Sequence, residues 1–212
     1  GVSLKKLKVL STGIHMDKFK NIDKKKVEQL KKEFNIKSNE KIILYVGMLT
    51  ERKGIDKVIK ISQRLLSEGH NVKTLLVGDA HGENIYKKKV DPKFKDKIIF
   101  AGGRKEIPEF MNLATILLLP SDGEGLPGVV MEAMASGLPV VATYEGCTPD
   151  LIESGNEGFL INIGNSAGYY RAVKHLISSN ETHKKFSENS RCKIQNFCWS
   201  KVSEKYENLY KA

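Results

Sequence analysis

Two carboxylates stand in the most apolar stretch of the chain, and their spacing suggests a chemistry. Glu124 and Glu132 lie eight positions apart in EGLPGVVMEAMASGLPVV (124–141), where the other residues are glycine, proline, serine or apolar. A helix beginning near Pro127 or Gly128 carries Glu132 as its only charge and is apolar nearly all round, which is typical of a buried helix. An unpaired carboxylate there is costly, so it must meet a basic group, a cluster of donors or a ligand.

The predicted start of this helix lies between the two glutamates. Its free N–H groups and the positive end of the helix dipole suit a phosphate, and carboxylates accept strong hydrogen bonds from sugar hydroxyls. We therefore consider a ligand with a ribose on Glu132, a diphosphate at the helix start and a sugar on Glu124. Two other interpretations stay open: a structural salt bridge between Glu132 and a lysine, and a solvated loop position for Glu124.

Composition limits the other possibilities. The chain has 212 residues, 40% of them hydrophobic, and a formal net charge of +10 that comes mostly from lysine. The lysines are spread along the chain, with short clusters at 24–26 and 87–89. Without an RNA-binding aromatic signature, a zinc finger or an arginine-rich run, this favours solvated surface lysines. A nucleic-acid interface becomes the better interpretation only if the lysines gather on one face.

Cysteine, histidine and apolar-run patterns bear on the compartment and on cofactors. The odd number of cysteines, three without C-x-x-C spacing, fits a reducing compartment. Without a D-x-D sequence after a strand or a clustered His/Cys pattern, we expect no metal and no cofactor. No apolar run approaches the roughly 20 residues that span a bilayer. We expect a cytoplasmic protein and leave peripheral attachment to the inner face of the membrane open.

Apolar runs alternate with helical patterns from residue 41 onward, and most of these runs are continuous rather than alternating. Such runs are typical of strands buried on both faces. The predicted strands are KIILYVGML (41–49), VKTLLVGD (72–79), KIIFAGG (97–103), TILLLPSD (115–122), PVVATYEG (139–146) and EGFLINIG (157–164). Helical spacing lies between them at 54–69, 105–114 and 127–137, with Pro108 in a first turn. This predicts an α/β fold: a Rossmann-like three-layer α/β/α domain around a mostly parallel six-stranded sheet.

The whole chain, 1–212, is predicted to be one domain. It begins with a lead-in over 1–40, an extended piece and a lysine-rich helix near 23–34; the core covers 41–164 and C-terminal helices cover 165–212. Ligands of such sheets bind beyond the carboxyl ends of the strands. Small residues gather at those ends: Gly47, Gly78, Gly102, Gly103, Gly146 and the loop 121–125. Turns need glycine in any case, but five such ends on one rim indicate a binding edge.

The sequence resembles a known family over roughly residues 5–210. EGLPGVVMEAMASGLPVV is similar to the glutamate–seven residues–glutamate motif of the retaining nucleotide-sugar glycosyltransferases of the GT-B fold, family 4 ("group 1"). Four further segments resemble the glycine-rich loop, a strand end, the base-pocket segment and the closing helix of that family: YVGMLTERKGIDKVIK (45–60), LLVGD (75–79), FAGGRKEIPEFMNLATILLLPS (100–121) and FCWSKVSEKYENLY (197–210).

The resemblance implies both an architecture and an activity. Members have two Rossmann-like halves with the active site between them, and this chain looks like the C-terminal, donor-binding half without the N-terminal acceptor half. The implied reaction is a hexosyltransferase-type transfer, with retention, from a nucleoside diphosphate sugar to a hydroxyl of a sugar or lipid-linked acceptor. It implies a role in cell-surface polysaccharide or glycolipid biosynthesis, and a fragment that is inactive alone.

The resemblance also assigns roles. Glu132 would bind the ribose, Glu124 the transferred sugar, and Lys53 would neutralise the diphosphate. Backbone groups would hold the sugar and diphosphate at Gly125, Leu126, Gly128 and Val129. The base would pack near Gly103, Arg104 and Ile107.

One departure from the family pattern concerns the phosphates. The family often has an arginine directly after the glycine that ends the first strand, here Gly47, but this chain has Met48. Arg52, beside Lys53, is a candidate replacement. Two alternatives to a transferase therefore remain: a non-catalytic nucleotide-sugar-binding module, and a sugar-nucleotide epimerase of similar fold. A dinucleotide oxidoreductase is disfavoured because no G-x-G-x-x-G follows the first strand.

Overall fold

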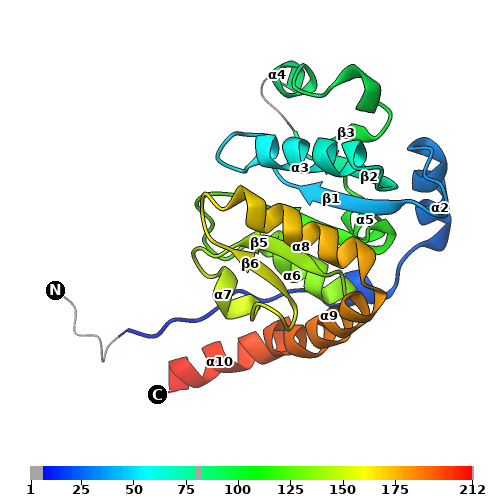
Figure 1. Ribbon diagram of the computed structural model, residues 1–212. Helices are drawn as coiled ribbons and strands as arrows, with labels where there is room; N and C mark the ends of the chain where they lie inside the picture. The colour runs from blue at the N-terminus through cyan, green and yellow to red at the C-terminus, as the bar shows by residue number, and fades with distance from the viewer. Residues whose placement is uncertain (1–6, 80–82, 212) are drawn as a thin grey trace.

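The computed structural model describes residues 7–79 and 83–211, and its centre is one six-stranded sheet (Figure 1). The strand order is β3-β2-β1-β4-β5-β6, and every adjacent pair is parallel. The strands are β1 (Lys41–Val46), β2 (Val72–Val77), β3 (Ile98–Gly102), β4 (Ile116–Leu119), β5 (Val140–Thr143) and β6 (Gly158–Ile161). Each falls inside one of the six apolar runs, which confirms the predicted Rossmann-like α/β fold.

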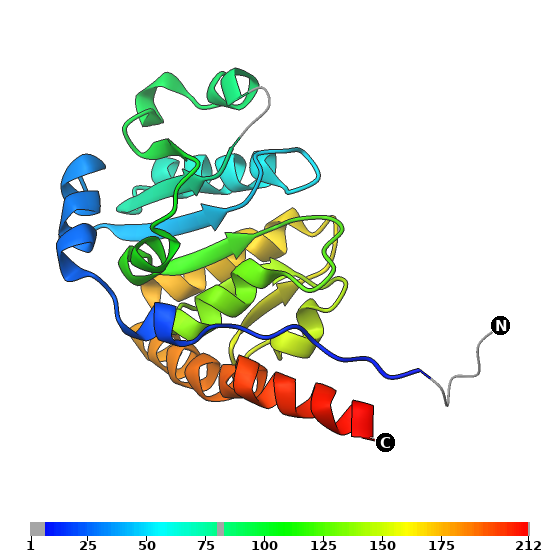
Figure 2. The same cartoon turned by 180° about the vertical axis from the view of Figure 1, so that it is seen from behind.

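Helices cover both faces of the sheet and give the three layers. One face carries α3 (Ile55–Ser67) and α8 (Ser166–Ser178), which lie in front of the sheet in Figure 1. The other face, seen in Figure 2, carries α5 (Ile107–Leu113) and α6 (Gly128–Ser136), with α2 (Lys24–Glu33) packed on α5. The helices expected near 23–34, 54–69, 105–114 and 127–137 are therefore confirmed, and Pro108 lies in the first turn of α5.

The continuous apolar runs form strands because both of their faces are covered. All four residues of β4 and of β5 are buried, and so are all six of β2. Burial of a Val, Leu or Ile side chain contributes roughly 1.5–3 kcal/mol. The alternation of apolar and polar residues that is typical of a sheet with one solvent-exposed face is therefore absent from these strands, as the sequence predicted.

The remaining elements are short helices and the C-terminal helices. They are α1 (Asp17–Lys20), α4 (Glu83–Lys87), η2 (Pro92–Phe94), α7 (Thr148–Leu151), α9 (Asn180–Lys193), η3 (Ile194–Phe197) and α10 (Trp199–Lys211). The tail holds three α-helices, α8 to α10, where two or three were expected. Over the described residues, no helix combines the length and the apolar character that crossing a membrane requires.

The start of the chain is tied to the start of α10. The Ile14 N–H donates to the Phe197 carbonyl at 2.9 Å, and the Trp199 N–H donates back to the Ile14 carbonyl at 3.3 Å. A Cβ atom on Gly13 would come within 2.6 Å of the Trp199 ring, so the indole needs glycine there. The expected extended piece at 8–14 is irregular apart from this bridge at Ile14, and it runs beside α10 in both views (Figures 1 and 2).

Candidate functional site

The loops at the carboxyl ends of the strands are brought together by glycines whose backbones touch neighbouring strands. Gly54 has φ +75°, and a Cβ there would lie 2.1 Å from the Pro120 carbonyl oxygen. A Cβ on Gly78 would lie 2.0 Å from the Gly47 carbonyl oxygen. These approaches exclude any side chain, so the glycine of the Lys53-Gly54 pair sets the loop before α3 directly against the end of β4.

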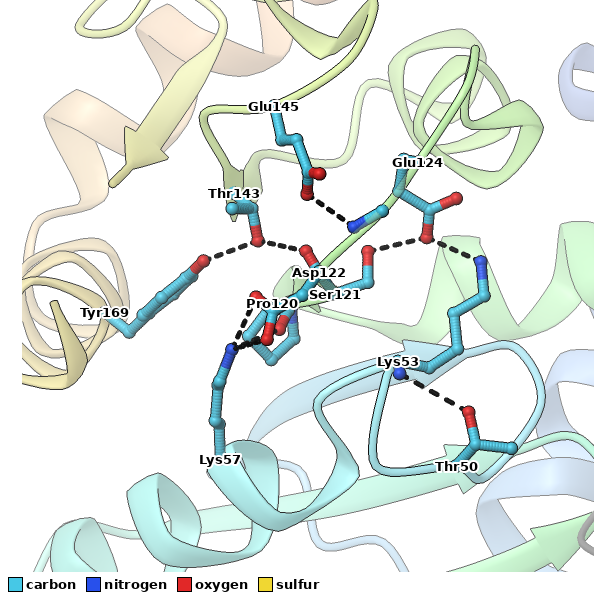
Figure 3. Close-up of polar contacts among 11 residues, drawn as sticks. Thr50, Lys53, Lys57, Pro120, Ser121, Asp122, Glu124, Thr143, Glu145 and Tyr169 are labelled. Carbon is cyan, nitrogen blue, oxygen red and sulfur yellow. Dashed lines mark hydrogen bonds and ion pairs between the residues drawn. The ribbon is translucent and has the colours of Figure 1, made fainter. Parts of the chain in front are cut away.

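That approach places Lys53 against Glu124, the first glutamate of the motif. The Lys53 Nζ donates to Glu124 Oε1 at 2.7 Å, and the Ser121 hydroxyl donates to the same oxygen at 2.6 Å (Figure 3). The side chains of Lys53 and Glu124 are only 18% and 13% exposed. Glu124 is therefore not a solvated loop acid, since an amine and a hydroxyl orient one of its oxygens.

A buried pair of hydroxyls supports the Ser121 backbone. The Thr143 hydroxyl donates to the Ser121 carbonyl at 2.6 Å and lies 2.6 Å from the Tyr169 hydroxyl (Figure 3). Burial raises the pKa of Tyr169 to about 12. Because Thr143 donates its only hydroxyl proton to the Ser121 carbonyl, the protonated Tyr169 hydroxyl is the donor to Thr143.

Three charged side chains hold the loop between Ser121 and Glu124. Lys57 donates to both carboxylate oxygens of Asp122, at 2.7 and 2.8 Å. The Arg52 guanidinium donates to the Gly123 carbonyl at 2.6 Å, and the Gly123 N–H donates to the Glu145 carboxylate. Arg52, the candidate replacement for the missing arginine, thus contacts the loop that carries Glu124.

Met48 occupies the position where the family often has arginine. Its side chain is 55% exposed, and its carbonyl accepts a hydrogen bond from the Tyr45 hydroxyl at 2.7 Å. Burial, followed by the nearby Glu124 carboxylate, raises the pKa of Tyr45 well above its usual value. A neutral, buried phenol therefore fixes the turn after β1, next to Gly47.

Glu132 differs from Glu124 in having no internal partner. Among the described residues, its carboxylate makes no hydrogen bond or ion pair, and burial raises its pKa against the opposing charge of Lys18. Glu132 lines a cavity of about 200 Å³ together with Gly128 and Met131 of α6. The rest of the lining comes from the segment before α2: Thr12, Gly13, Ile14, His15, Lys18 and Phe19. The salt-bridge interpretation of Glu132 is not supported, because Lys18 is near it without contacting it.

The start of α6 lies between the two glutamates, as expected. The N-cap residue is Pro127 and no side chain caps the helix. The Val130 N–H already donates to the Pro127 carbonyl at 3.0 Å, whereas the N–H groups of Gly128 and Val129 make no hydrogen bond within the described residues. Gly125 and Gly128 are exposed and border open space, whereas Leu126 and Val129 pack on the core. The backbone at Gly125 and Gly128 is thus accessible to a ligand.

The three residues expected around the base of a nucleotide do not contact Lys53, Glu124 or Glu132. Arg104 donates to the Ala101 carbonyl at 2.8 Å and pairs with Glu33 on α2. Gly103 packs against Asp79, since a Cβ there would lie 2.4 Å from the Asp79 carboxylate. Ile107 begins α5 and packs on the core. None of these contacts connects the three residues to Lys53 or the glutamates.

Sequence reasoning missed several residues of this region. His15 and Lys18 line the cavity of Glu132 but belong to a lead-in that carries no periodic pattern. The supporting roles of Thr143 and Tyr169 depend on contacts across 22 and 26 residues. Over residues 7–79 and 83–211, no group of three or more His, Cys, Asp and Glu side chains is arranged to hold a metal ion.

Known proteins with similar sequences include bacterial proteins named as glycosyltransferases. The chain is 29% identical over 189 residues to N-acetyl-alpha-D-glucosaminyl L-malate synthase of Bacillus anthracis, which covers 88% of this chain and 49% of that protein. It is 26% identical over 204 residues to the capsular polysaccharide biosynthesis glycosyltransferase CapM of Staphylococcus aureus, covering 94% and 53%. The chain therefore spans about half the length of the curated relatives it matches.

Solved structures share the fold, and a family model identifies the family. Anabaena Alr3699/HepE, solved with UDP-glucose, superposes with a TM-score of 0.83 at 24% identity, over 97% of this chain and 57% of that one. The C-terminal domain of a group 1 family protein (LpcC) from Francisella tularensis gives a TM-score of 0.74 at 23% identity, over 87% and 97%. Residues 26–193 match the family model described as glycosyl transferases group 1. Because that match covers most of the chain, the protein belongs to the glycosyl transferases group 1 family.

Proposed function

We propose that this chain is the donor-binding half of a retaining, family 4 glycosyltransferase of the hexosyltransferase type. One observation carries the proposal: the start of α6, which no side chain caps, lies between a lysine–glutamate pair and a half-buried glutamate that has no partner among the described residues. A nucleoside diphosphate sugar matches this arrangement, with an anion in the middle and hydroxyls at both ends. Relatives named for capsular polysaccharide and lipopolysaccharide synthesis support a role in polysaccharide or glycolipid biosynthesis.

The ion pair prepares the site for the sugar and the diphosphate. In the free protein, Lys53 and Glu124 neutralise each other at 2.7 Å. A bound donor supplies a new partner to each: a phosphate oxygen for the Lys53 ammonium, and sugar hydroxyls for the Glu124 carboxylate. The N–H groups and dipole at the start of α6 add to the attraction for the diphosphate. Arg52, already beside Gly123, is placed to add positive charge where Met48 gives none.

Glu132 is the proposed partner of the ribose. Burial raises its pKa and so disfavours the ionised form. Two ribose hydroxyls donating to the carboxylate supply the hydrogen bonds that the free protein lacks. Gly128 lies one helical turn before Glu132 and lines the same cavity. Because Gly128 has no side chain and borders open space, it leaves the cavity next to Glu132 open to a nucleotide.

The proposed transfer uses these groups electrostatically. As the bond from the anomeric carbon to the diphosphate breaks, negative charge grows on the leaving phosphate. The Lys53 ammonium and the start of α6 stabilise that charge. The acceptor hydroxyl attacks the same face of the sugar, which gives retention, and its proton passes to the leaving diphosphate. No metal takes part in this proposal. The acceptor would be a sugar or lipid-linked sugar held by an N-terminal half.

A second candidate is a nucleotide-sugar-binding module without transferase activity. The exposed Met48 side chain favours it, since a neutral thioether stands where the family often has a cation. The two proposals agree on donor binding and differ in turnover once an acceptor half is present.

Calorimetric titration tests donor binding. We expect one or more of the UDP-, GDP- and ADP-sugars to bind, and Glu132→Gln to reduce affinity by roughly 10- to 100-fold, since hydrogen bonds to a charged group contribute about 1.5–3 kcal/mol. Glu28→Gln, an exposed glutamate on α2, is the matched control. If Glu132→Gln and Glu28→Gln bind the donor equally well, the ribose assignment is wrong.

A further inference from the structure

A lysine-rich surface lies at the β3 edge of the sheet, outside the site described above. Six of the eleven residues at 87–97 are lysines, against two aspartates. This segment runs from α4 through η2 to β3, at the opposite end of the sheet from α7 and α10 (Figure 1). We call residues 85–100 the β3-edge surface.

Some of the positive charge on this surface is not compensated within the protein. Three of its lysines pair with a carboxylate: Lys89 with Asp56, Lys93 with Asp91, and Lys97 with Glu40. Lys88 and Lys95 are both exposed, and neither contacts a carboxylate in the part of the chain that the structure describes. These two ammonium groups therefore remain available to an external anion.

The same lysines border an apolar hollow. A cavity of about 640 Å³ is lined by Val90, Pro92, Ile98, Ile99 and Phe100, with Lys87, Lys88 and Lys95 completing its wall. The Lys87 ammonium lies 5.7 Å from the centre of the Phe100 ring. Ile85, two residues before Lys87 on α4, is 62% exposed. The surface therefore combines cations with apolar groups that water solvates poorly.

We propose that the β3-edge surface binds an anionic lipid bilayer. Lys88 and Lys95 would meet lipid phosphates, while Ile85 and the hollow would take up hydrocarbon at the headgroup boundary. A nucleic acid would satisfy the lysines and leave Ile85 and the hollow in water. The lysine count, the two unpaired ammonium groups and the apolar hollow therefore fit an amphiphile better than a soluble polyanion.

The position of this surface gives the contact a consequence for the site. α4 follows β2 in the chain, so the surface begins near the carboxyl edge of the sheet, where Lys53 and Glu124 lie. The α4 end of the surface therefore shares the sheet edge that carries the proposed donor site. This inference concerns lipid binding alone and does not require that a sugar be transferred.

Vesicle co-sedimentation of the 212-residue chain tests the proposal. We expect binding to vesicles made of equal parts phosphatidylcholine and phosphatidylglycerol, and little binding to phosphatidylcholine alone. Lys88→Gln/Lys95→Gln should weaken binding about 30-fold, as two lysines near an anionic membrane surface contribute. Ile85→Ser should also weaken binding relative to wild type, and this loss should persist in high salt, where the electrostatic contribution of the lysines is screened.

The chain contains a matched control for net charge. Residues 24–27 repeat the K-K-K-V sequence of 87–90, and Lys25 and Lys26 are exposed at the start of α2. Lys25→Gln/Lys26→Gln removes the same charge and should leave vesicle binding within about twofold of wild type. An unchanged thermal unfolding midpoint for each variant excludes loss of fold.

Three results would overturn the proposal. The first is equal vesicle binding by the two double variants, which would mean that net charge alone acts. The second is equal binding to neutral and anionic vesicles. The third is loss of binding to a duplex DNA oligonucleotide on Lys88→Gln/Lys95→Gln while vesicle binding persists, which would make the surface a polyanion site.

Discussion

At the scale of residues, the two glutamates of the motif are held in opposite ways. Lys53 and Ser121 orient the Glu124 carboxylate. Glu132 lines a cavity, burial raises its pKa, and its carboxylate has no hydrogen-bond or ion-pair partner among the residues that the structure describes. In the ion pair, the attraction between Lys53 and Glu124 offsets part of the cost of desolvating both charges. The Glu132 carboxylate has no such compensation, so its ionised form is disfavoured until a ligand donates hydrogen bonds to it. This difference yields two separate tests.

Replacing Lys53 should affect the phosphate part of a ligand selectively. We expect Lys53→Ala to weaken binding of a nucleoside diphosphate by roughly 10- to 100-fold, since charge-assisted hydrogen bonds contribute about 1.5–3 kcal/mol. Binding of the nucleoside alone should change little. Calorimetry with both ligands measures this, and Lys60→Ala, an exposed lysine on α3, is the control. Equal losses for both ligands would argue against a phosphate contact.

Glu132 should make donor binding depend on acidity. Burial raises the pKa of its carboxyl in the free protein, and the proposed ligand binds the ionised form. Affinity should therefore be constant at high pH and fall as the pH drops through the raised pKa, above the ordinary glutamate value. The pH profile of the dissociation constant measures this fall, which Glu132→Gln should remove.

Lys18 provides a check on that assignment. Its positive charge opposes the rise in the pKa of Glu132, so Lys18→Met should move the loss of affinity to higher pH. Lys20→Met, on the same short helix, should leave it in place. An identical pH profile for wild type and Glu132→Gln would contradict the proposed role.

At the scale of elements, one close approach sets the geometry of the pair. Gly54 is the N-cap residue of α3, and its backbone contacts the Pro120 carbonyl at the end of β4. This contact places Lys53 beside Glu124 across 71 residues of sequence. The α3 helix also ends next to a second glycine in the left-handed region, Gly69, with φ +82° and open space around it. Gly54 and Gly69 both need a left-handed backbone conformation, but only at Gly54 would a Cβ atom clash with a neighbouring backbone.

Alanine at the two glycines should separate these effects. Gly69→Ala should destabilise the fold by about 1–2 kcal/mol, the cost of a left-handed conformation for a residue with a side chain. Gly54→Ala should cost about 2 kcal/mol more, because its Cβ must displace the Pro120 backbone. Urea denaturation measures both. Donor affinity should fall only for Gly54→Ala, and similar stabilities would mean that the contact with β4 yields easily.

The sequence predicted the larger elements and fewer of the contacts. Continuous Val, Ile and Leu runs identify a buried parallel strand, so all six strands were predicted. The short helices α1, α4 and α7 were not, because four or five residues hold no recognisable period and depend on tertiary packing. The placement of Glu132 in a cavity closed by the lead-in also escaped prediction, since no local pattern relates His15 or Lys18 to α6.

At the scale of the whole molecule, the chain spans about half of its relatives, and its site opens at the carboxyl edge of a single sheet. The proposed donor contacts all come from this half. In a transferase of two Rossmann-like halves, the acceptor is oriented by the other half, and orientation supplies a large part of the rate.

The chain alone should therefore bind a donor without transferring it. We expect calorimetry to detect the nucleotide sugar, while assays for nucleoside diphosphate release with sugar acceptors show little or no turnover. Release that rises only when an N-terminal half is supplied in the same chain would support the transferase over the binding module. Brisk turnover by these 212 residues alone would contradict the proposed division of labour.

The contact between Gly13 and Trp199 has a practical consequence. Trp199 is the only tryptophan, and its ring centre lies 6.0 Å from that of His15, which borders the cavity of Glu132. The Trp199 indole is thus a native fluorophore that contacts the lining of that cavity through His15. A change in its emission on adding a nucleotide would report occupancy directly, without a label.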